Sequence, residues 1–250
     1  IEELLPKVEA YGKDKEKLDK LNEELPEKLK KSILQEAIEG RLVPQDPNDE
    51  PASVLLDKIR KEKARLVKEG KLKKKDLEET PISEDEKPFE IPESWEWCRF
   101  FSVFKLETNL VSPKTYLDYP HVAPDNIEKG TGRLLNYRTV KDDNVISNNH
   151  LFHKGQIVYS KIRPLLRKAV IAPFDGLCSA DMYPLSTILS IDYALYYILS
   201  DTFNKQVSDI CSSRVKMPKI NQNELSSVMV PLPPLAEQKR IVSKVENLFA

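Results

Sequence analysis

Residues 151–174 form a stretch without aspartate or glutamate, in a chain that is otherwise balanced in charge. Lysine and arginine side chains bind phosphate oxygens, and the forked guanidinium of arginine can also read guanine edges. If the stretch begins as a strand, Lys161 and Arg163 share one face, and Pro164 then ends regular pairing. The following turn would present Arg167 and Lys168. The pattern predicts a phosphate-binding surface, with a solvated edge strand as the alternative. Its cations are Lys154, Lys161, Arg163, Arg167 and Lys168.

Residues 212–225, SSRVKMPKINQNEL, form a second basic cluster. Arg214, Lys216 and Lys219 alternate there with small or apolar residues, and an Asn-Gln-Asn run begins at Asn221. Basic side chains suit phosphate, and side-chain amides suit adenine edges. The alternative is structural, because an asparagine such as Asn221 or Asn223 often caps a turn or a short helix.

Residues 137–152 supply a third candidate cluster, weakened by Asp142 and Asp143. It comprises Arg138, Lys141, Asn148, Asn149 and His150.

Catalytic motifs are missing from the sequence. It holds no G-x-x-x-x-G-K-[ST] phosphate loop and no Asn/Asp-Pro-Pro-aromatic methyltransferase signature. Pro124-Asp125 and Glu128-Lys129 lack the strand and spacing of a metal-dependent nuclease, and His150 with His153 is a weak metal motif. Three widely spaced cysteines, Cys98, Cys178 and Cys211, fit a reducing cytoplasm rather than a disulfide framework. We therefore expect a non-catalytic, cytoplasmic protein without its own cofactor or metal.

Charge divides the chain into two parts, although the net charge is only −1. Residues 1–94 hold 20 basic and 25 acidic residues, whereas residues 95–250 hold 19 and 15. The second part is therefore the one expected to meet an anionic partner.

Apolar residues of the first 40 positions follow alternating steps of three and four, which predicts a helix with a heptad pattern. They are Ile1, Leu4, Val8, Tyr11, Leu18 and Leu25. We expect this helix to pair with a second helix, the alternative being that it lies on its own domain. Pro26 is predicted to start a further helix that ends near Gly40.

The remaining pattern predicts an α/β (α+β) fold: a mixed β-sheet domain with long helical spacer arms. Residues 41–52 read as a loop, Ser53 as the cap of a helix ending at Gly70, and residues 71–94 as a linker or surface-hugging segment. We predict a helical region with a linker at 1–94, a β-rich domain at 95–233 and the start of a C-terminal helix at 234–250. A helix is expected near 191–210, with Tyr193, Tyr196 and Tyr197 in its core. No signal peptide or membrane span is expected.

The two ends of the chain resemble each other: VENLFA at the C-terminus aligns with IEELLP at the N-terminus. The sequence begins with Ile1 rather than methionine. We interpret the chain as one period of a larger repeat, or a fragment of it, whose arms pair within a longer chain or between two copies.

Several phrases resemble the specificity (S) subunits of bacterial Type I restriction–modification enzymes. Residues 25–97, from LPEKLKKSILQEAIEGRLVPQDPNDEPASVLLDKIRKEKARLVKEGK to EKPFEIPESWEW, look like the central conserved region of that family. YPHVAPDNIEKGTGRL, GQIVYSKIRPLLRKAVIAPFDGLCSADMYPL, KMPKINQNEL and PLPPLAEQKRIVSKVENL resemble successive signatures of its target recognition domains. They cover most of the chain in the family's order.

The resemblance implies a non-catalytic subunit that binds double-stranded DNA at one half of a split target. It implies docking to a methyltransferase (M) subunit that methylates adenine with S-adenosylmethionine. It also implies that a restriction (R) subunit joins through the complex. ATP and magnesium would then be bound by the partner subunits only. This chain departs from the pattern in having one recognition domain, so it resembles a half-subunit or a fragment. Two rival hypotheses are a coiled-coil protein-interaction module and the recognition tail of a larger methyltransferase or nuclease.

Overall fold

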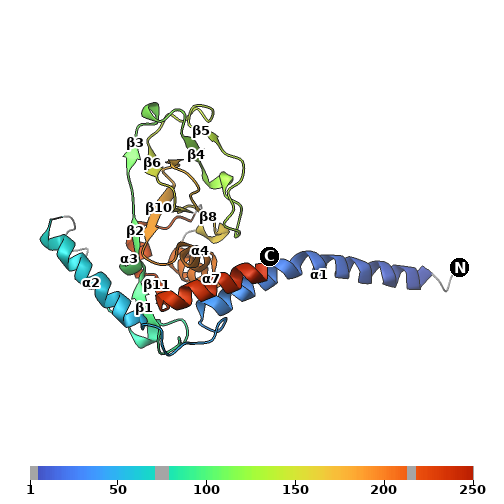
Figure 1. The fold of residues 1–250 in the computed structure, drawn as a ribbon. Helices are drawn as coiled ribbons and strands as arrows, with labels where there is room; N and C mark the ends of the chain where they lie inside the picture. The colour runs from blue at the N-terminus through green and yellow to red at the C-terminus, as the bar shows by residue number, and fades with distance from the viewer. Residues whose placement is uncertain (1–4, 71–78, 213–217, 250) are drawn as a thin grey trace.

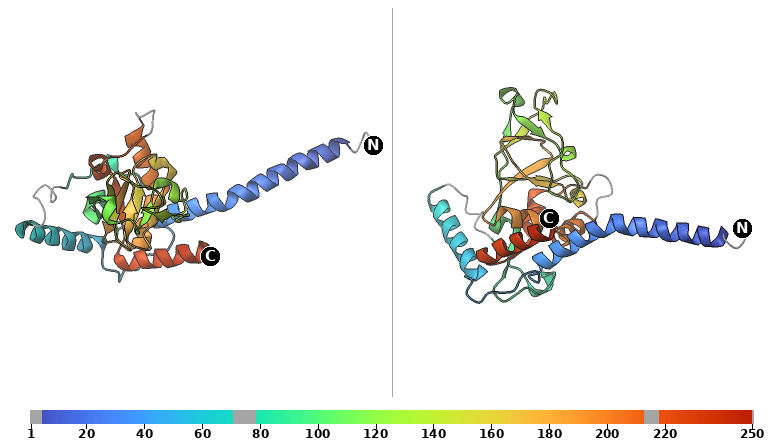
Figure 2. Two further views of the ribbon diagram at one scale, coloured as in Figure 1. Left: turned by 90° about the horizontal axis from the view of Figure 1, so that it is seen from above. Right: turned by 45° about the vertical axis from the view of Figure 1, so that its right-hand side comes forward.

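The computed structural model describes residues 5–70, 79–212 and 218–249. Helix α1 (Leu5–Ile38) leaves the base of the molecule as a long arm, and α2 (Ala52–Lys68) leaves it in another direction (Figures 1 and 2). The C-terminal helix α7 (Leu235–Phe249) packs beside the inner end of α1. Between them stands a β-rich domain, so the predicted α/β class with helical arms is confirmed.

The prediction that a new helix starts at Pro26 is wrong, because α1 is continuous and contains Pro26 in its interior. A proline lacks the N–H that would bond to the previous turn, so it usually costs about 3 kcal/mol inside a helix. Lys28 and Lys20 each pair with Glu24 one turn away, at 2.6 and 3.9 Å, which favours the helical backbone on either side of Pro26.

The prediction that Ser53 caps the second helix is also wrong. The N-cap of α2 is Pro51, which has no side chain that could accept a backbone N–H, and Ser53 lies inside the first turn. Ala52 and Leu56 are buried, so packing of this end replaces a cap as the source of order. Gly70 follows the helix with φ +71°, as expected for a residue that ends a helix.

The β-rich domain holds three small sheets. The first is an antiparallel pair of β1 (Glu96–Arg99) and β11 (Met229–Leu232). The second has the order β2 (Phe104–Leu106), β10 (Met182–Thr187), β7 (Ile157–Ser160), β8 (Ala169–Ile171). The third has the order β3 (Leu110–Val111), β6 (Asn149–Phe152), β9 (Gly176–Cys178), β4 (Pro120–Val122), β5 (Arg138–Thr139). Only the β4–β9 pairing among these named strands is parallel, which makes the domain mixed.

Short helical elements join these strands and cover the sheets. They are α3 (Phe100–Val103), α4 (Ile191–Leu199), α5 (Asp201–Cys211), α6 (Gln222–Ser227) and the single turns η2 (Glu84–Glu86), η3 (Pro113–Thr115), η4 (Pro124–Asn126) and η5 (Pro164–Leu166).

The helix expected near residues 191–210 is two helices. Ser200 has an extended backbone between α4 and α5, and its hydroxyl accepts from the backbone N–H of Phe203, so it caps α5. Tyr193 and Tyr197 are fully buried, as predicted, and donate to the carbonyls of Pro231 and Met229 at 3.0 and 2.7 Å. These bonds fasten α4 to β11.

Helices α1, α2 and α7 and the β-rich domain share one hydrophobic core. Ile38 and Leu56 from the first two helices belong to the same buried cluster as Phe100, Tyr197 and Ile241. At the centre, Glu237 of α7 is buried and accepts from Trp95 Nε1 at 2.8 Å and from Gln45 Nε2 at 2.6 Å. Burial raises the pKa of Glu237, although both hydrogen bonds oppose this. No helix of the described residues is long and apolar enough to cross a membrane.

Candidate nucleic-acid interface

Two of the basic segments predicted from sequence lie side by side. Ile162 and Lys219 pair as an isolated antiparallel bridge. The backbone N–H of Arg163 donates to Pro218 at 2.8 Å, and that of Ile220 donates to Lys161 at 3.0 Å. Segments 161–163 and 218–220 therefore form one continuous edge, although no sequence pattern connected them.

The backbone of this edge is unusual at Arg163. Its φ of 45° lies in the left-handed region, which side-chain-bearing residues rarely adopt. Pro164 then begins the single turn η5, which ends at Arg167 with φ 51°. The turn predicted after Pro164 is thus present. It leaves Arg163 exposed, because the chain reverses there instead of continuing along β7.

Lys161 is held over an aromatic ring at the end of β7. Its Nζ lies 4.8 Å from the ring centroid of Tyr183, which is buried in β10. Partial burial, and next the charge of Lys219, lower the pKa of Lys161. The contact restrains the lysine while its ammonium group remains available to an anion. Tyr183 had no role in the sequence-based prediction.

Lys219 is anchored to an acidic neighbour. Its Nζ lies 3.0 Å from Asp181 Oδ1, and the Asp181 carbonyl accepts from the backbone N–H of Lys161. No sequence pattern predicted this pairing, since Asp181 is distant from Lys219 along the chain. Asp181 positions both lysines.

Arg167 and Lys168 are mostly covered rather than presented by the turn. Arg167 forms an ion pair with Asp201 and donates to the carbonyl of Leu199, with 20% of its side chain exposed. Lys168 donates to the carbonyl of Pro124 at 2.7 Å, with 15% exposed. These contacts give both residues a structural role, and their predicted contact with DNA stays a prediction.

Lys154 is separated from this edge. It lies exposed in the turn between β6 and β7, whereas Lys161 follows the other end of β7. Its backbone N–H donates to Asp175 at 2.7 Å. Any contact that Lys154 makes with a nucleic acid would therefore involve a different part of the domain.

Asn221 caps α6, which is the structural alternative considered for it. Its Oδ1 accepts from the backbone N–H of Glu224 at 3.0 Å, and its own N–H donates to the Glu224 carboxylate at 2.8 Å. The side-chain oxygen of Asn221 is thus already engaged. Gln222 and Asn223 are exposed beside it. The predicted residues Arg214 and Lys216 lie outside the described residues.

The third cluster divides in two. Arg138 pairs with Asp143 at 2.7 Å, and the other oxygen of Asp143 lies 2.7 Å from His121 Nδ1. The contact with His121 is the main reason why the pKa of Asp143 is lowered. This arrangement of β4 and β5 was not foreseen, because β4 is remote in sequence. Lys141 is exposed in the turn that follows β5.

The other half of the third cluster leads into β6. Asn148 is exposed, whereas Asn149 and His150 are buried. Burial, and next the charge of Lys161, lower the pKa of His150. Asn148 is therefore the asparagine of this cluster whose side chain is free to meet a nucleic acid, and its predicted contact with DNA stays a prediction. Within the described residues, no group of three or more His, Cys, Asp and Glu residues could hold a metal ion.

Comparison with known proteins adds a second kind of evidence. Residues 92–250 match the family model described as "Type I restriction modification DNA specificity domain". The chain is 47% identical over 160 residues to the specificity subunit of the Type I restriction enzyme EcoDI of Escherichia coli, covering 64% of this chain and 36% of that protein. It is 36% identical over 265 residues to the EcoAI specificity subunit of the same organism, covering 100% of this chain and 44% of that protein.

The fold is also found among solved structures. The HsdS subunit from Thermoanaerobacter tengcongensis superposes with a TM-score of 0.57 at 24% identity, over 65% of this chain and 44% of that one. At that identity the likeness concerns the fold alone. The chain spans roughly two fifths of the length of these curated relatives.

Proposed function

Because the chain belongs to the Type I restriction–modification DNA specificity family, we propose that its β-rich domain binds one half of a two-part DNA target. The observation that carries this proposal is the pairing of Ile162 with Lys219, which joins two basic segments into one edge. Exposed Arg163 and the restrained Lys161 and Lys219 suit successive phosphates or guanine edges of a duplex. Exposed Asn148, which precedes β6, adds an amide suited to adenine.

The positioning of these side chains favours specific over loose binding. A cation held against Tyr183 or Asp181 loses less side-chain freedom when it meets DNA than a fully mobile lysine. Contacts to phosphate fix the register of the protein on the duplex, and contacts to base edges supply the sequence information. We assign Lys161 and Lys219 to the first task, and Arg163 and Asn148 to the second.

In this proposal the chain has no catalytic role and works through partners. A methyltransferase subunit carries S-adenosylmethionine and modifies adenine in the target, and a restriction subunit with ATP and magnesium joins through the complex. We assign methyltransferase docking to the inner end of α1 together with α2 and α7. We assign the complex to the cytoplasm, because that is where it would meet the host DNA.

The arm α1 suits pairing with a second arm. Among its described residues it exposes apolar side chains on one face, namely Tyr11, Leu18, Leu21, Leu25 and Leu29, each 56–70% exposed. A helix with such a stripe gains stability by burying it against another helix. We propose that two copies, or two halves of a longer chain, pair there and present two recognition domains to a split site.

The experiment is to co-express the chain with its cognate methyltransferase and to map N6-methyladenine across the host genome. A single two-part motif that disappears in the R163A/K219A variant would establish both the function and the DNA-binding edge. A motif that persists in the variant would keep the function and reject this edge. A stable complex with the methyltransferase that methylates no motif would contradict the proposed function.

A further inference from the structure

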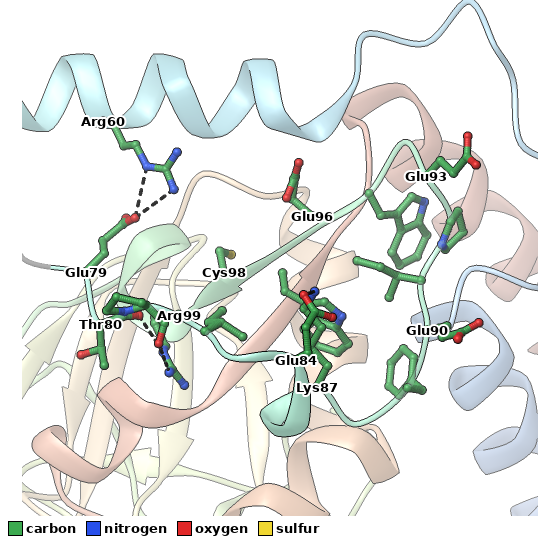
Figure 3. A pocket seen from close by; sticks show the side chains of 17 residues that line it. Arg60, Glu79, Thr80, Glu84, Lys87, Glu90, Glu93, Glu96, Cys98 and Arg99 are labelled. Atoms are coloured by element: carbon green, nitrogen blue, oxygen red, sulfur yellow. Dashed lines mark hydrogen bonds and ion pairs between the residues drawn. The ribbon is translucent and has the colours of Figure 1, made fainter.

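A pocket of about 860 Å³ opens between α2 and residues 79–99, on a part of the chain that the DNA-binding edge does not use. Figure 3 shows Arg60 reaching down from α2 toward Glu79, with Glu90, Glu93 and Glu96 along the other walls. The aromatic rings of Phe89, Trp95 and Trp97 also line it. None of these residues belongs to the predicted nucleic-acid clusters.

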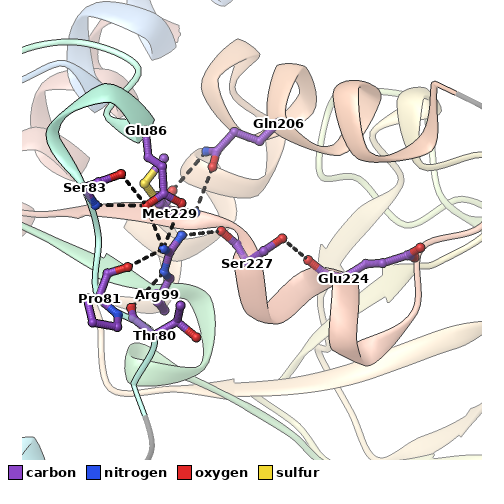
Figure 4. A network of polar contacts seen from close by, with 9 residues as sticks. All are labelled: Thr80, Pro81, Ser83, Glu86, Arg99, Gln206, Glu224, Ser227 and Met229. Atoms are coloured by element: carbon purple, nitrogen blue, oxygen red, sulfur yellow. Dashed lines mark hydrogen bonds and ion pairs between the residues drawn. The ribbon is translucent and has the colours of Figure 1, made fainter.

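The walls of the pocket are held in place by the rest of the fold. Arg99 donates to the carbonyls of Thr80 and Pro81 at 3.1 and 2.8 Å, to Ser227 at 2.9 Å, and to the carboxylate of Glu86 (Figure 4). These bonds fasten residues 79–86 to the sheet formed by β1 and β11. Trp95 is fixed from behind by Glu237. The pocket is therefore preformed, which lowers the entropy cost of filling it.

Its charge favours a cation. Five carboxylates and three cationic side chains line it, and each of the three cations is paired with a carboxylate of the chain. Glu90, Glu93 and Glu96 form no ion pair among the described residues, so three negative charges remain for an occupant. A phosphate backbone would be repelled from such a surface, because carboxylates oppose it.

Its aromatic lining favours an occupant with apolar character. The rings of Phe89 and Trp97 meet edge to face at 5.0 Å, and both residues line the pocket beside the carboxylates. A peptide segment with lysine or arginine supplies a cationic head on an aliphatic stem, which suits both the carboxylates and the rings of the pocket.

We propose that this pocket docks a segment of the methyltransferase subunit that carries lysine or arginine beside an apolar residue. The inference rests on the proposed function and adds to it a defined contact. It also explains the charge division of the chain. The acidic residues 1–94 would contact protein, and the basic residues 95–250 would contact DNA. A second copy of this chain is the poorer occupant, since its described basic edge is the one assigned to DNA.

The test measures binding of the purified methyltransferase to the whole chain by biolayer interferometry at low and high salt. The variants are E90K/E93K, the neutral E90Q/E93Q, and a matched control, D118K/D209K, which makes the same charge change on the recognition domain. Thermal unfolding verifies that each variant is folded, and binding to a nonspecific duplex verifies the DNA-binding edge.

We expect E90K/E93K to weaken methyltransferase binding at least tenfold and E90Q/E93Q to weaken it less, with the difference from wild type shrinking at high salt. D118K/D209K should stay within twofold of wild type, and E90K/E93K should bind duplex at least as well as wild type. Equal methyltransferase binding by E90K/E93K and wild type would overturn the pocket assignment alone. Wild type that binds DNA but no methyltransferase would overturn the proposed function together with the pocket.

Discussion

The side chain of Lys219 lies 3.0 Å from Asp181, so a carboxylate occupies the centre of the edge assigned to DNA. Asp181 holds Lys219 in place, yet it also repels phosphate. We expect D181N to raise the affinity for any duplex about threefold to tenfold at low salt, because the amide keeps the shape and removes the charge. Fluorescence anisotropy with a labelled duplex measures the change.

The matched control for D181N is D175N, at the far end of β7, where Asp175 accepts from the backbone N–H of Lys154. D175N should leave DNA affinity within about twofold of wild type. If D181N weakens binding as much as removal of a cation does, then Asp181 serves mainly to position the lysines.

Arg163 and Arg167 share the left-handed backbone conformation but differ in their partners. Arg163 is exposed, whereas Arg167 is tied to Asp201 and Leu199. We expect R163A to cost about 1–3 kcal/mol of binding free energy to the cognate site and to leave the unfolding temperature nearly unchanged. R167A should lower the unfolding temperature and change DNA affinity little. DNA titrations over a range of salt measure the affinity of each variant, and calorimetry measures its unfolding temperature. If R163A lowered the unfolding temperature and R167A lowered the DNA affinity, this division of roles would be contradicted.

The stripe on α1 gives a prediction about assembly. Leu18 and Leu25 lie one heptad apart and are 57% and 60% exposed, so replacing them by glutamate removes little packing from the monomer. L18E/L25E should shift the mass measured by light scattering from a dimer toward the 28.7 kDa monomer. The control, K13E/K31E, changes charge on the opposite face and should remain dimeric. A wild-type chain that is monomeric at all concentrations would refute pairing between copies.

Glu86 predicts a defined dependence of stability on pH. The backbone N–H of Ser83, and next Arg99, lower the pKa of Glu86 from 4.5 to about 2. A carboxylate whose pKa is lowered by folding contributes stability above its unfolded pKa and loses it as pH falls toward the folded one. The gap in urea midpoint between wild type and E86Q should be full at pH 7 and shrink between about pH 4.5 and 2. If the difference in urea midpoint between wild type and E86Q does not change with pH, then packing of the Glu86 side chain, and not its charge, accounts for its contribution to stability.

The sequence predicted the elements well where periodicity was strong. The heptad stripe predicted the first part of α1, and the Pro and Gly positions predicted the turn at η5 and the end of α2. The apolar spacing predicted Tyr193, Tyr196 and Tyr197 as core residues, and of these Tyr193 and Tyr197 are fully buried whereas Tyr196 is only partly buried. It failed where tertiary packing overrode local signals. A helix without a side-chain cap and a break at Ser200 are tolerated because neighbouring buried residues fix the backbone. Pro26 lies in an exposed part of α1, where the ion pairs of Glu24 with Lys20 and Lys28 favour the helix.

The candidate site was predicted as separate segments and not as a surface. Composition identified the acid-free run at residues 151–174 and the basic cluster at residues 212–225, because charge is a property of the local sequence. The bridge between Ile162 and Lys219, the ring of Tyr183 under Lys161, and the covering of Arg167 by Asp201 all depend on long-range pairing. No spacing rule within one sequence encodes such contacts, so the predicted group of cations included some whose side chains hold the fold together.

Two buried tyrosines offer a matched test of the core. The hydroxyl of Tyr159 is buried and has no hydrogen-bond partner among the described residues, whereas that of Tyr197 donates to Met229 at 2.7 Å. Removing an unsatisfied hydroxyl costs nothing or stabilises, but removing a satisfied one loses about 1 kcal/mol. Y159F should therefore unfold at the wild-type temperature or slightly above it, and Y197F about 2–4 °C below it. If Y159F loses as much stability as Y197F, then the Tyr159 hydroxyl is bound in solution, and a buried water is the partner to look for by crystallography.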